Sequence, residues 1–406
     1  MVRFKALDAW RGICALLVVL FHFCFVFRSP LMGAPIVTNA FLFVDFFFVL
    51  SGFVVCHAYR DRLGDAPSWR AFVVRRFGRL WPLHAAMLAL FIAFIALVNL
   101  LPHPARFAFT LGPSEYSAIA IPIHVLLLNA VDLHGMAWNA PSWSIGAEFY
   151  TYLLFGAVCV LALRRLSLAA AALVLASIAL LAMVAPSYMN STADFGLFRC
   201  VAGFFTGVIA YRLHEIWGHR RLPLATLCEA GIVALVALFV IRASHGPDAV
   251  RALSLAAPLA FAAAVLVFAR EQGAISRLLQ APPFEALGRW SYSIYMSHQL
   301  VLMAAAFLAW SLAGAAGVAL EREVVVEGQA KTLYDLGGVW QSHAALAGVL
   351  LVVLALSALT YSRIEEPARL AFSAMAKRME RGEAVRRAFA QVRERQVPAR
   401  RVSTIT

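Results

Sequence analysis

The sequence predicts an all-α protein that crosses a membrane about ten times, and three observations lead to this prediction. Hydrophobic residues make up 62% of the 406 residues and charged residues only 14%, with a mean hydropathy of +0.78. A soluble domain usually carries about 25% charged residues. The apolar residues fall into runs of roughly 18 to 24, the length that a helix needs to cross about 30 Å of hydrocarbon. These runs alternate with charged or Pro/Gly-containing stretches, so several spans are expected.

The net charge of +13 does not indicate a nucleic-acid partner. The basic residues lie between apolar runs and do not form one patch with interleaved aromatic residues. A lipid bilayer is therefore the expected partner. The six cysteines lie in or beside apolar runs without metal-ligand spacing, so they are interpreted as reduced core residues and no metal is expected.

The first apolar run is interpreted as a retained span and not as a cleaved signal peptide. Asp8 and Arg11 interrupt its start, and no small-x-small cleavage site follows. Nine further runs have spanning length. The ten predicted spans are residues 8–28, 41–59, 82–101, 143–163, 168–186, 195–213, 222–241, 253–270, 290–310 and 343–363.

The positive charges between the runs predict the orientation. With a cytoplasmic N-terminus, most arginines of the loops fall on the inside, where Lys and Arg accumulate in membrane proteins. Ten spans then place both termini in the cytoplasm. The sequence predicts a transmembrane domain over residues 1–370 and a basic cytoplasmic tail over 371–406, with its helix-friendly stretch on the anionic inner leaflet.

Two segments outside the spans receive separate interpretations. Residues 117–131 are apolar but too short to span, and they are interpreted as a re-entrant or interfacial helix. The outer loop 311–342 either shapes the choice of substrate or is only a connector.

Ionisable residues inside spans are the first functional candidates, because their burial in a bilayer is costly. His22 lies about 20 Å along the first span, and Arg11 precedes it by eleven positions on nearly the same helix face, some 16 Å away. This face presents a cation near the inner surface and an imidazole in the outer half. The alternative is a structural histidine between helices and an arginine that reaches the inner surface.

Two carboxylates are predicted at about the depth of His22. Asp45 and Glu148 each lie about five residues inside the outer end of a span, where a carboxylate can orient an imidazole or share its proton. Arg199, near the outer end of the sixth span, is an alternative partner for either carboxylate in a purely structural ion pair.

Two arginines stand at the predicted inner surface before the third span. Arg76 and Arg79 are three positions apart, so they project from one helix face and can hold a phosphate group. The topology of membrane proteins also favours arginines at this place, so this pair alone is a weak signal.

Taken together, these residues fall into an ordered set of motifs. The set comprises Arg11 and His22 with ten residues between them, Phe-Val-Leu-Ser-Gly-Phe at 48–53, Arg76 with Arg79, Trp143-Ser144 with Glu148-Phe149-Tyr150, Arg199 with Gly203 and Gly207, Ser-Tyr-Ser-Ile-Tyr-Met-Ser-His at 291–298, and Glu366-Pro367. In order and span position this set resembles the acyltransferase-3 family from residue 3 to about 370. No single motif is decisive, but seven in register are.

The resemblance implies an inner-membrane enzyme of bacteria that transfers an acyl group, usually acetyl, from acyl-CoA to a hydroxyl of a glycan, lipid or small molecule. In that case Arg76 and Arg79 hold the CoA phosphates, with Arg11 further along the path. His22 is the catalytic base and Glu148 orients it or binds the acceptor. The residues then expected in the substrate cavity are Asp45, Ser51, Trp143, Arg199, Tyr295 and His298.

Two other classes of function remain open on the sequence. A transporter or flippase of a glycan or lipid precursor also places ionisable residues inside spans, but it does not need paired arginines at one mouth only. A non-catalytic scaffold or sensor leaves His22 unexplained. The sequence does not distinguish direct transfer from an acyl-enzyme intermediate, and it gives no oligomeric state.

Overall fold

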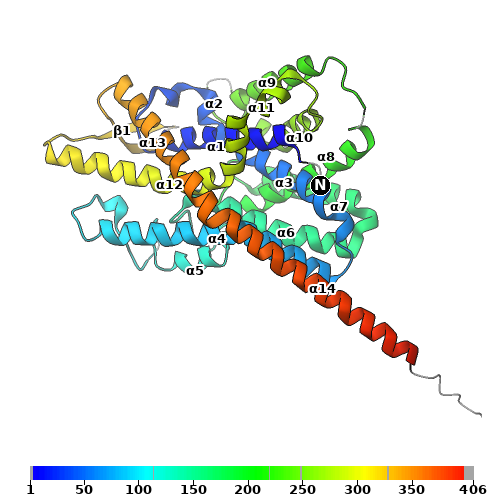
Figure 1. Ribbon diagram of the computed structural model, residues 1–406. Helices are drawn as coiled ribbons and strands as arrows, with labels where there is room; N and C mark the ends of the chain where they lie inside the picture. Colours follow the sequence, from blue (N-terminus) through cyan, green and yellow to red (C-terminus); the bar gives the residue numbers. More distant parts are fainter. Residues whose placement is uncertain (1–2, 113, 219, 247–248, 327–328, 397–406) are drawn as a thin grey trace, which may run out of the picture.

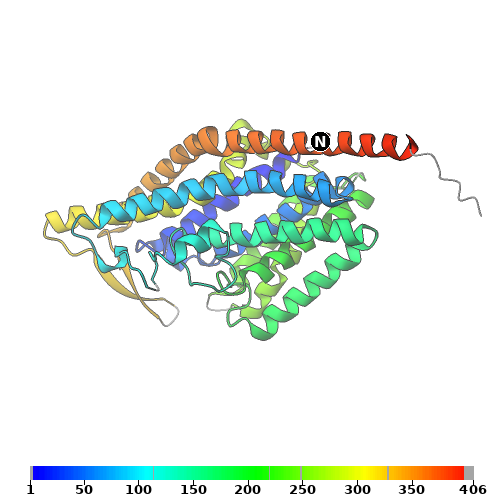
Figure 2. The same cartoon turned by 90° about the horizontal axis from the view of Figure 1, so that it is seen from below.

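The computed structural model describes residues 3–112, 114–218, 220–246, 249–326 and 329–396 as a bundle of long helices (Figures 1 and 2). Most of the long helices run side by side in both views. They are α1 (Lys5–Phe23), α3 (Phe43–Tyr59), α4 (Ala66–Val98), α6 (Trp143–Ala162), α7 (Leu166–Val184), α8 (Gly196–Trp217), α9 (Ala225–Arg242), α10 (Ala257–Phe268), α12 (Pro282–Ala315), α13 (Val339–Thr360) and α14 (Glu366–Gln396). The short helices are α2 (Pro35–Thr38), α5 (Ala120–Val125) and α11 (Ala274–Leu279).

Within the described residues, nine helical segments are long and apolar enough to cross a membrane. One of them, Ala140–Val184, contains two spans, because a 3₁₀ turn at Leu163–Arg165 divides it into α6 and α7. Another, Arg251–Phe268, combines a 3₁₀ turn with α10. Each of the ten predicted spans thus overlaps one helix, and the prediction of an α-helical polytopic membrane bundle is confirmed.

Glycines allow the helices α3 and α8 to pack closely. A Cβ atom added to Gly52 would collide with the carbonyl oxygen of Phe204, and one added to Gly207 would collide with that of Val49. Helices in a bilayer gain little from the hydrophobic effect, so close approach at small residues is a main source of their association. This contact fixes the position of the polar residues on α3.

Helix α4 begins well before the predicted third span. The Asp65 side chain accepts a hydrogen bond from the Ser68 amide at 2.9 Å, and the Ser68 hydroxyl lies 3.2 Å from the Asp65 amide, which makes a capping box. The helix therefore starts at Ala66 and carries the arginines 75, 76 and 79 in helical register before it reaches the apolar run.

The short helix α5 confirms the prediction of a helix that does not span. It has six residues, and its C-terminal carbonyl groups are bonded by side chains of neighbouring spans. Trp81 Nε1 donates to the Val125 carbonyl at 3.0 Å, and the Tyr150 hydroxyl donates to that of Leu126 at 3.0 Å. Irregular backbone at this depth needs such internal partners.

A small β-hairpin in the predicted outer loop 311–342 departs from the all-α prediction. Its strands β1 (Glu321–Val326) and β2 (Gln329–Tyr334) are antiparallel, with Glu321 opposite Tyr334. Tyr334 also forms a bridge to Phe27, which follows α1. The loop is thus tied to the segment that follows α1.

Helix α14 continues α13 through a π-helical turn at Tyr361–Glu365 and passes residue 371 without a break. It packs against α4, where Phe372 covers Gly78 and Arg75 pairs with Glu380 at 2.6 Å. Beyond these contacts the helix extends away from the bundle (Figure 1). Residues 397–406 of the predicted tail lie outside the described residues.

Candidate active site

A cavity of about 150 Å³ lies between α1, α3, α4, α6 and α12. Its wall is amphipathic, with most of its apolar side chains from α3 and most of its polar side chains from the other four helices. The polar residues that line it are Asp8, Arg11, Ser51, Arg76, Arg79, Ser144, Glu148, Tyr152, Ser291, Tyr292 and Tyr295. Six of the eleven residues predicted for the site line this cavity: Arg11, Ser51, Arg76, Arg79, Glu148 and Tyr295.

Arg76 reaches the cavity as a cation without a carboxylate partner among the described residues. Its guanidinium lies 5.1 Å from the ring centroid of Tyr59 and 5.5 Å from that of Tyr152, and it donates to the Tyr59 hydroxyl at 3.3 Å. Its buried Nε has no hydrogen-bond partner. The two tyrosine faces hold the charge in place and leave N–H groups free for an anion.

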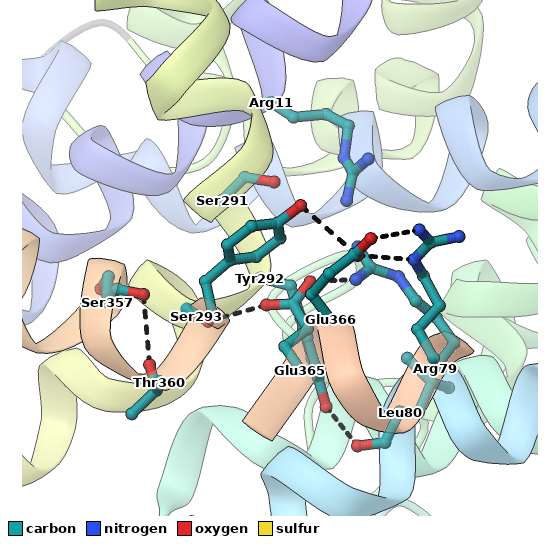
Figure 3. A network of polar contacts seen from close by, with 12 residues as sticks. Arg11, Arg79, Leu80, Ser291, Tyr292, Ser293, Ser357, Thr360, Glu365 and Glu366 are labelled. Atoms are coloured by element: carbon teal, nitrogen blue, oxygen red, sulfur yellow. Dashed lines mark hydrogen bonds and ion pairs between the residues drawn. The ribbon is translucent and has the colours of Figure 1, made fainter. Parts of the chain in front are cut away.

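Arg79, one helical turn further, is already paired (Figure 3). It forms an ion pair with Glu365, whose side chain is fully buried, and it lies 5.3 Å from the ring centroid of Tyr292. Glu365 also accepts a hydrogen bond from the Ser293 hydroxyl at 2.7 Å, and the Tyr292 hydroxyl donates to the Leu80 carbonyl at 2.6 Å. This network joins α4, α12 and the π-helical turn before α14.

Arg11 approaches the same cavity from α1 and points toward this network (Figure 3). Its nearest carboxylate is that of Asp8, one turn earlier on the same helix, at 3.6 Å. Three cations from two helices, Arg11, Arg76 and Arg79, thus line one cavity, and their role in binding an anion stays a prediction.

Glu148 and two hydroxyls form a compact polar cluster on the opposite side of Tyr152. Glu148 Oε1 accepts hydrogen bonds from the Ser51 and Tyr152 hydroxyls, both at 2.5 Å, and these two hydroxyl oxygens are 2.8 Å apart. Tyr152 thereby carries the Arg76 cation on its ring and donates to the Glu148 carboxylate through its hydroxyl. No hydrogen bond joins Glu148 to His22 in the described part of the chain.

His22 lies beyond the cavity and pairs with another histidine. Its Nδ1 is 2.9 Å from the Val18 carbonyl oxygen and 3.2 Å from Nε2 of His298. The two imidazole centroids are 4.8 Å apart. Tyr295 links this pair to the cavity, because its ring lies 5.8 Å from that of His298 while its own side chain lines the cavity.

Asp45, Arg199 and Trp143 form a separate buried cluster that does not line the cavity. Arg199 donates to both carboxylate oxygens of Asp45 at 2.9 and 2.8 Å and lies 5.4 Å from the Trp143 ring centroid. The geometry is that of the structural ion pair which the sequence left open. Neither Asp45 nor Glu148 contacts the His22 imidazole, where the sequence had suggested an orienting carboxylate.

Tyr152 and Glu365 were not singled out as site residues in the sequence, and Tyr292 stood only within the motif at 291–298, without a role of its own. Tyr152 stands one turn after Glu148 on α6, and Tyr292 begins the Tyr-Ser-Ile-Tyr segment, so spacing gave some signal for both. Glu365 gave none, since it is 286 positions from Arg79. Within the described residues there is no cluster of three His, Cys, Asp or Glu side chains that could hold a metal ion.

The fold defines a polytopic membrane protein, and a cavity with cationic, carboxylate and hydroxyl groups in such a bundle is its candidate site for a polar ligand. Comparison with known proteins gives the class of chemistry. The family model described as an acyltransferase domain, that of the acyltransferase-3 family, matches residues 4–362. The chain belongs to this family of membrane acyltransferases.

Two curated relatives are similar to the chain, and one of them is named as an acyltransferase. The chain is 36% identical over 184 residues to protein 2 in the picA locus of Rhizobium radiobacter, which covers 43% of this chain and 93% of that protein. It is 27% identical over 336 residues to the acyltransferase MdmB of Streptomyces mycarofaciens, covering 74% of this chain and 79% of that one. No solved structure matches the chain at a significant level.

Proposed function

We propose that the protein transfers an acyl group, in the first instance acetyl, from acyl-CoA on the cytoplasmic side to a hydroxyl of a glycan, lipid or small-molecule acceptor. The protein then resides in a bacterial inner membrane with both termini in the cytoplasm. The observation that supports this most directly is Arg76, a guanidinium that lines the cavity and has no carboxylate partner among the described residues. Such a cation suits a phosphate group of coenzyme A.

The three arginines would not contribute equally to the donor site. Arg76 offers free N–H groups, whereas Arg79 is paired with Glu365 and Arg11 lies near Asp8. We therefore assign the phosphate contact to Arg76 first, with Arg11 along the path of the pantetheine arm. Arg79 would hold the wall of the site through Tyr292 and Glu365.

His22 is the proposed general base. The acceptor hydroxyl oxygen attacks the thioester carbonyl carbon while the imidazole takes the hydroxyl proton; the carbon–sulfur bond then breaks and the thiolate takes the proton back from the imidazolium. Holding donor and acceptor together in a cavity closed to water would supply much of the acceleration. The Glu148–Ser51–Tyr152 cluster would bind acceptor or donor groups beside the reacting carbonyl.

The first experiment measures acetyl-CoA binding to detergent-purified protein. A charge-assisted hydrogen bond contributes about 1.5–3 kcal/mol. Arg76→Ala should therefore raise the dissociation constant of acetyl-CoA roughly 10- to 100-fold. Arg75→Ala is the matched control, because Arg75 precedes Arg76 but pairs with Glu380 outside the cavity. Binding that is equal in all three proteins would contradict the donor site, and the absence of binding to any acyl-CoA would favour a transporter.

The second experiment tests the base in the same preparations. His22→Ala should abolish acyl transfer and leave acetyl-CoA affinity unchanged, because His22 lies outside the cavity that holds Arg76. Full turnover by a folded His22→Ala variant would refute the assignment of the base without affecting the donor site.

A further inference from the structure

We infer that His298 is the positioning residue that fixes the tautomer and ring orientation of His22, a role usually filled by a carboxylate. This inference rests on the proposed function, because it concerns how His22 acts as a base. It is carried by the hydrogen bonds of the two imidazoles, which come from α1 and α12.

The tautomer of His298 follows from its own backbone contact. Its Nδ1 lies 3.3 Å from the Ile294 carbonyl oxygen, and a carbonyl oxygen only accepts hydrogen bonds. Nδ1 therefore carries the proton, and Nε2 of the neutral ring is an acceptor. The side chain is fully buried, so this acceptor depends on a partner within the protein.

The same reasoning assigns the tautomer of His22. Its Nδ1 faces two acceptors, the Val18 carbonyl oxygen at 2.9 Å and Nε2 of His298 at 3.2 Å. If the His22 Nδ1–H is shared between the two acceptors, then this donor, the Val18 carbonyl and His298 Nε2 all have a hydrogen-bond partner. The lone pair of His22 is then on Nε2, which forms no hydrogen bond within the described chain, and this is the atom that would accept the proton of an attacking hydroxyl.

A single backbone acceptor would not hold the ring firmly enough. The Val18 carbonyl lies one turn below on the same helix, so it moves with α1, whereas His298 fixes the imidazole from a second helix. When Nε2 takes a proton the ring becomes a cation, and both Nδ1–H bonds then become charge-assisted and stronger. The neutral imidazole of His298 thus stabilises the charged intermediate without introducing a buried carboxylate.

A purely structural bond between α1 and α12 predicts a different result from a positioning bond. These helices make the most extensive contact of any pair in the bundle, and one imidazole bond adds little to it. A structural role would change stability alone. A positioning role changes turnover at unchanged donor affinity.

The test compares three variants in which donor affinity, stability and kcat are measured. His298→Leu removes the acceptor, and His298→Gln places an amide oxygen near the position of Nε2. Gln299→Leu is the control, because it is a buried neighbour on the same helix with no bond to His22. General-base catalysis contributes about 10²- to 10⁴-fold, so His298→Leu should lower kcat by roughly 100-fold or more with acetyl-CoA KM within about three-fold of the wild type. His298→Gln should recover at least about ten-fold of that loss.

Each outcome separates the inference from the proposed function. Wild-type kcat in His298→Leu, with His22→Ala inactive, overturns the positioning role and keeps the base. An equal loss of kcat in His298→Leu and His298→Gln also overturns the positioning role, because the hydrogen-bond acceptor would then make no difference. Activity in His22→Ala overturns the base itself.

A measurement on the unaltered protein covers the case in which His298→Leu does not fold. Isotope-labelled histidine reports the tautomer by its ring nitrogen shifts, with the His22 signals assigned from their loss in His22→Ala. The inference requires Nδ1–H for both His22 and His298 in the neutral state. An Nε2–H tautomer at His22 overturns it.

Discussion

Replacing Arg199 with methionine should destabilise the protein strongly, although this residue lies outside the cavity. Its guanidinium makes four hydrogen bonds: two to Asp45, one to the Phe41 carbonyl at 2.8 Å and one to the Ser191 carbonyl at 3.1 Å. The side chains of the ion pair are 1% and 0% exposed. Water cannot replace these contacts once the cation is removed.

The size of the effect follows from what remains behind. Methionine fills part of the volume but leaves the Asp45 carboxylate buried with no cation. Breaking a buried ion pair by removing one partner costs about 3–5 kcal/mol. The double variant Asp45→Leu/Arg199→Met removes the orphaned charge as well and should recover at least about 2 kcal/mol, with two unpaired carbonyls accounting for the rest.

The assay is thermal or denaturant unfolding of equally monodisperse detergent samples, with acyl transfer measured on the folded fraction. Arg212→Met is the control, because Arg212 lies on the same helix and pairs with Glu215 but is 42% exposed. Exposed pairs contribute about 0–1 kcal/mol. The reasoning is refuted if Arg199→Met is as stable as Arg212→Met; a stable Arg199→Met that loses turnover would instead support the sequence prediction of a cavity residue.

Two further predictions concern packing and pH. Gly207→Ala should destabilise the protein by about 1–3 kcal/mol in unfolding assays, because the added methyl group meets the Val49 carbonyl at the α3–α8 contact. The control Gly231→Ala on α9 should be neutral, because no atom lies within 4 Å of the added carbon. A neutral Gly207→Ala would contradict the close approach. The Arg28 guanidinium donates a hydrogen bond to Asp335 at 2.6 Å and lowers the pKa of that carboxyl. The bond should therefore stabilise the β-hairpin at any pH above the ordinary carboxyl pKa of about 4. This stabilisation should be lost as the pH falls through the lowered pKa of the folded state. Asp335→Asn should therefore speed amide exchange in β2 at pH 7, and unchanged exchange would refute the role of this bond.

The spans were predictable because the bilayer imposes their length on the sequence. An apolar run of about 20 residues identifies a span whatever its neighbours are, so every predicted span overlaps a helix. The limits of the helices were less predictable. Helix α4 starts at Ala66, 16 positions before the predicted span at 82, because the Asp65–Ser68 capping box starts the helix before the apolar run.

The β-hairpin could not be predicted from local pattern. Its strands include only a short run of valines beside charged residues, and its attachment to Phe27 joins positions 307 apart. Strand pairing of this kind depends on tertiary contacts more than on propensity. The same limit applies to residues 397–406, for which the sequence prediction stays a prediction.

The polar residues of the site could be predicted, but their partners could not. An ionisable residue inside a span is costly to bury, so it can be recognised from the sequence without knowledge of its neighbours. This criterion identified Arg11, His22, Asp45 and Glu148. Which residue neutralises which is a matter of three-dimensional packing. His22 meets an imidazole 276 positions away and not a carboxylate, because α12 packs along the whole of α1 and places His298 at its level.

The three arginines of the cavity, Arg11, Arg76 and Arg79, differ in how their charges are balanced. Arg79 has Glu365, whereas Arg11 shares the Asp8 carboxylate, at 3.6 Å, with Arg3, which lies 2.7 Å from it. Arg76 and Glu148 line the same cavity and form no ion pair in the described chain. Tyr152 stands between them, with the cation on its ring and the carboxylate at its hydroxyl, so they cannot neutralise each other directly. A ligand that satisfies both must present an anion at one point and a hydrogen-bond donor at another. A phosphate-bearing thioester with amide and hydroxyl groups meets this requirement, whereas a simple anion or a simple cation satisfies only half of it.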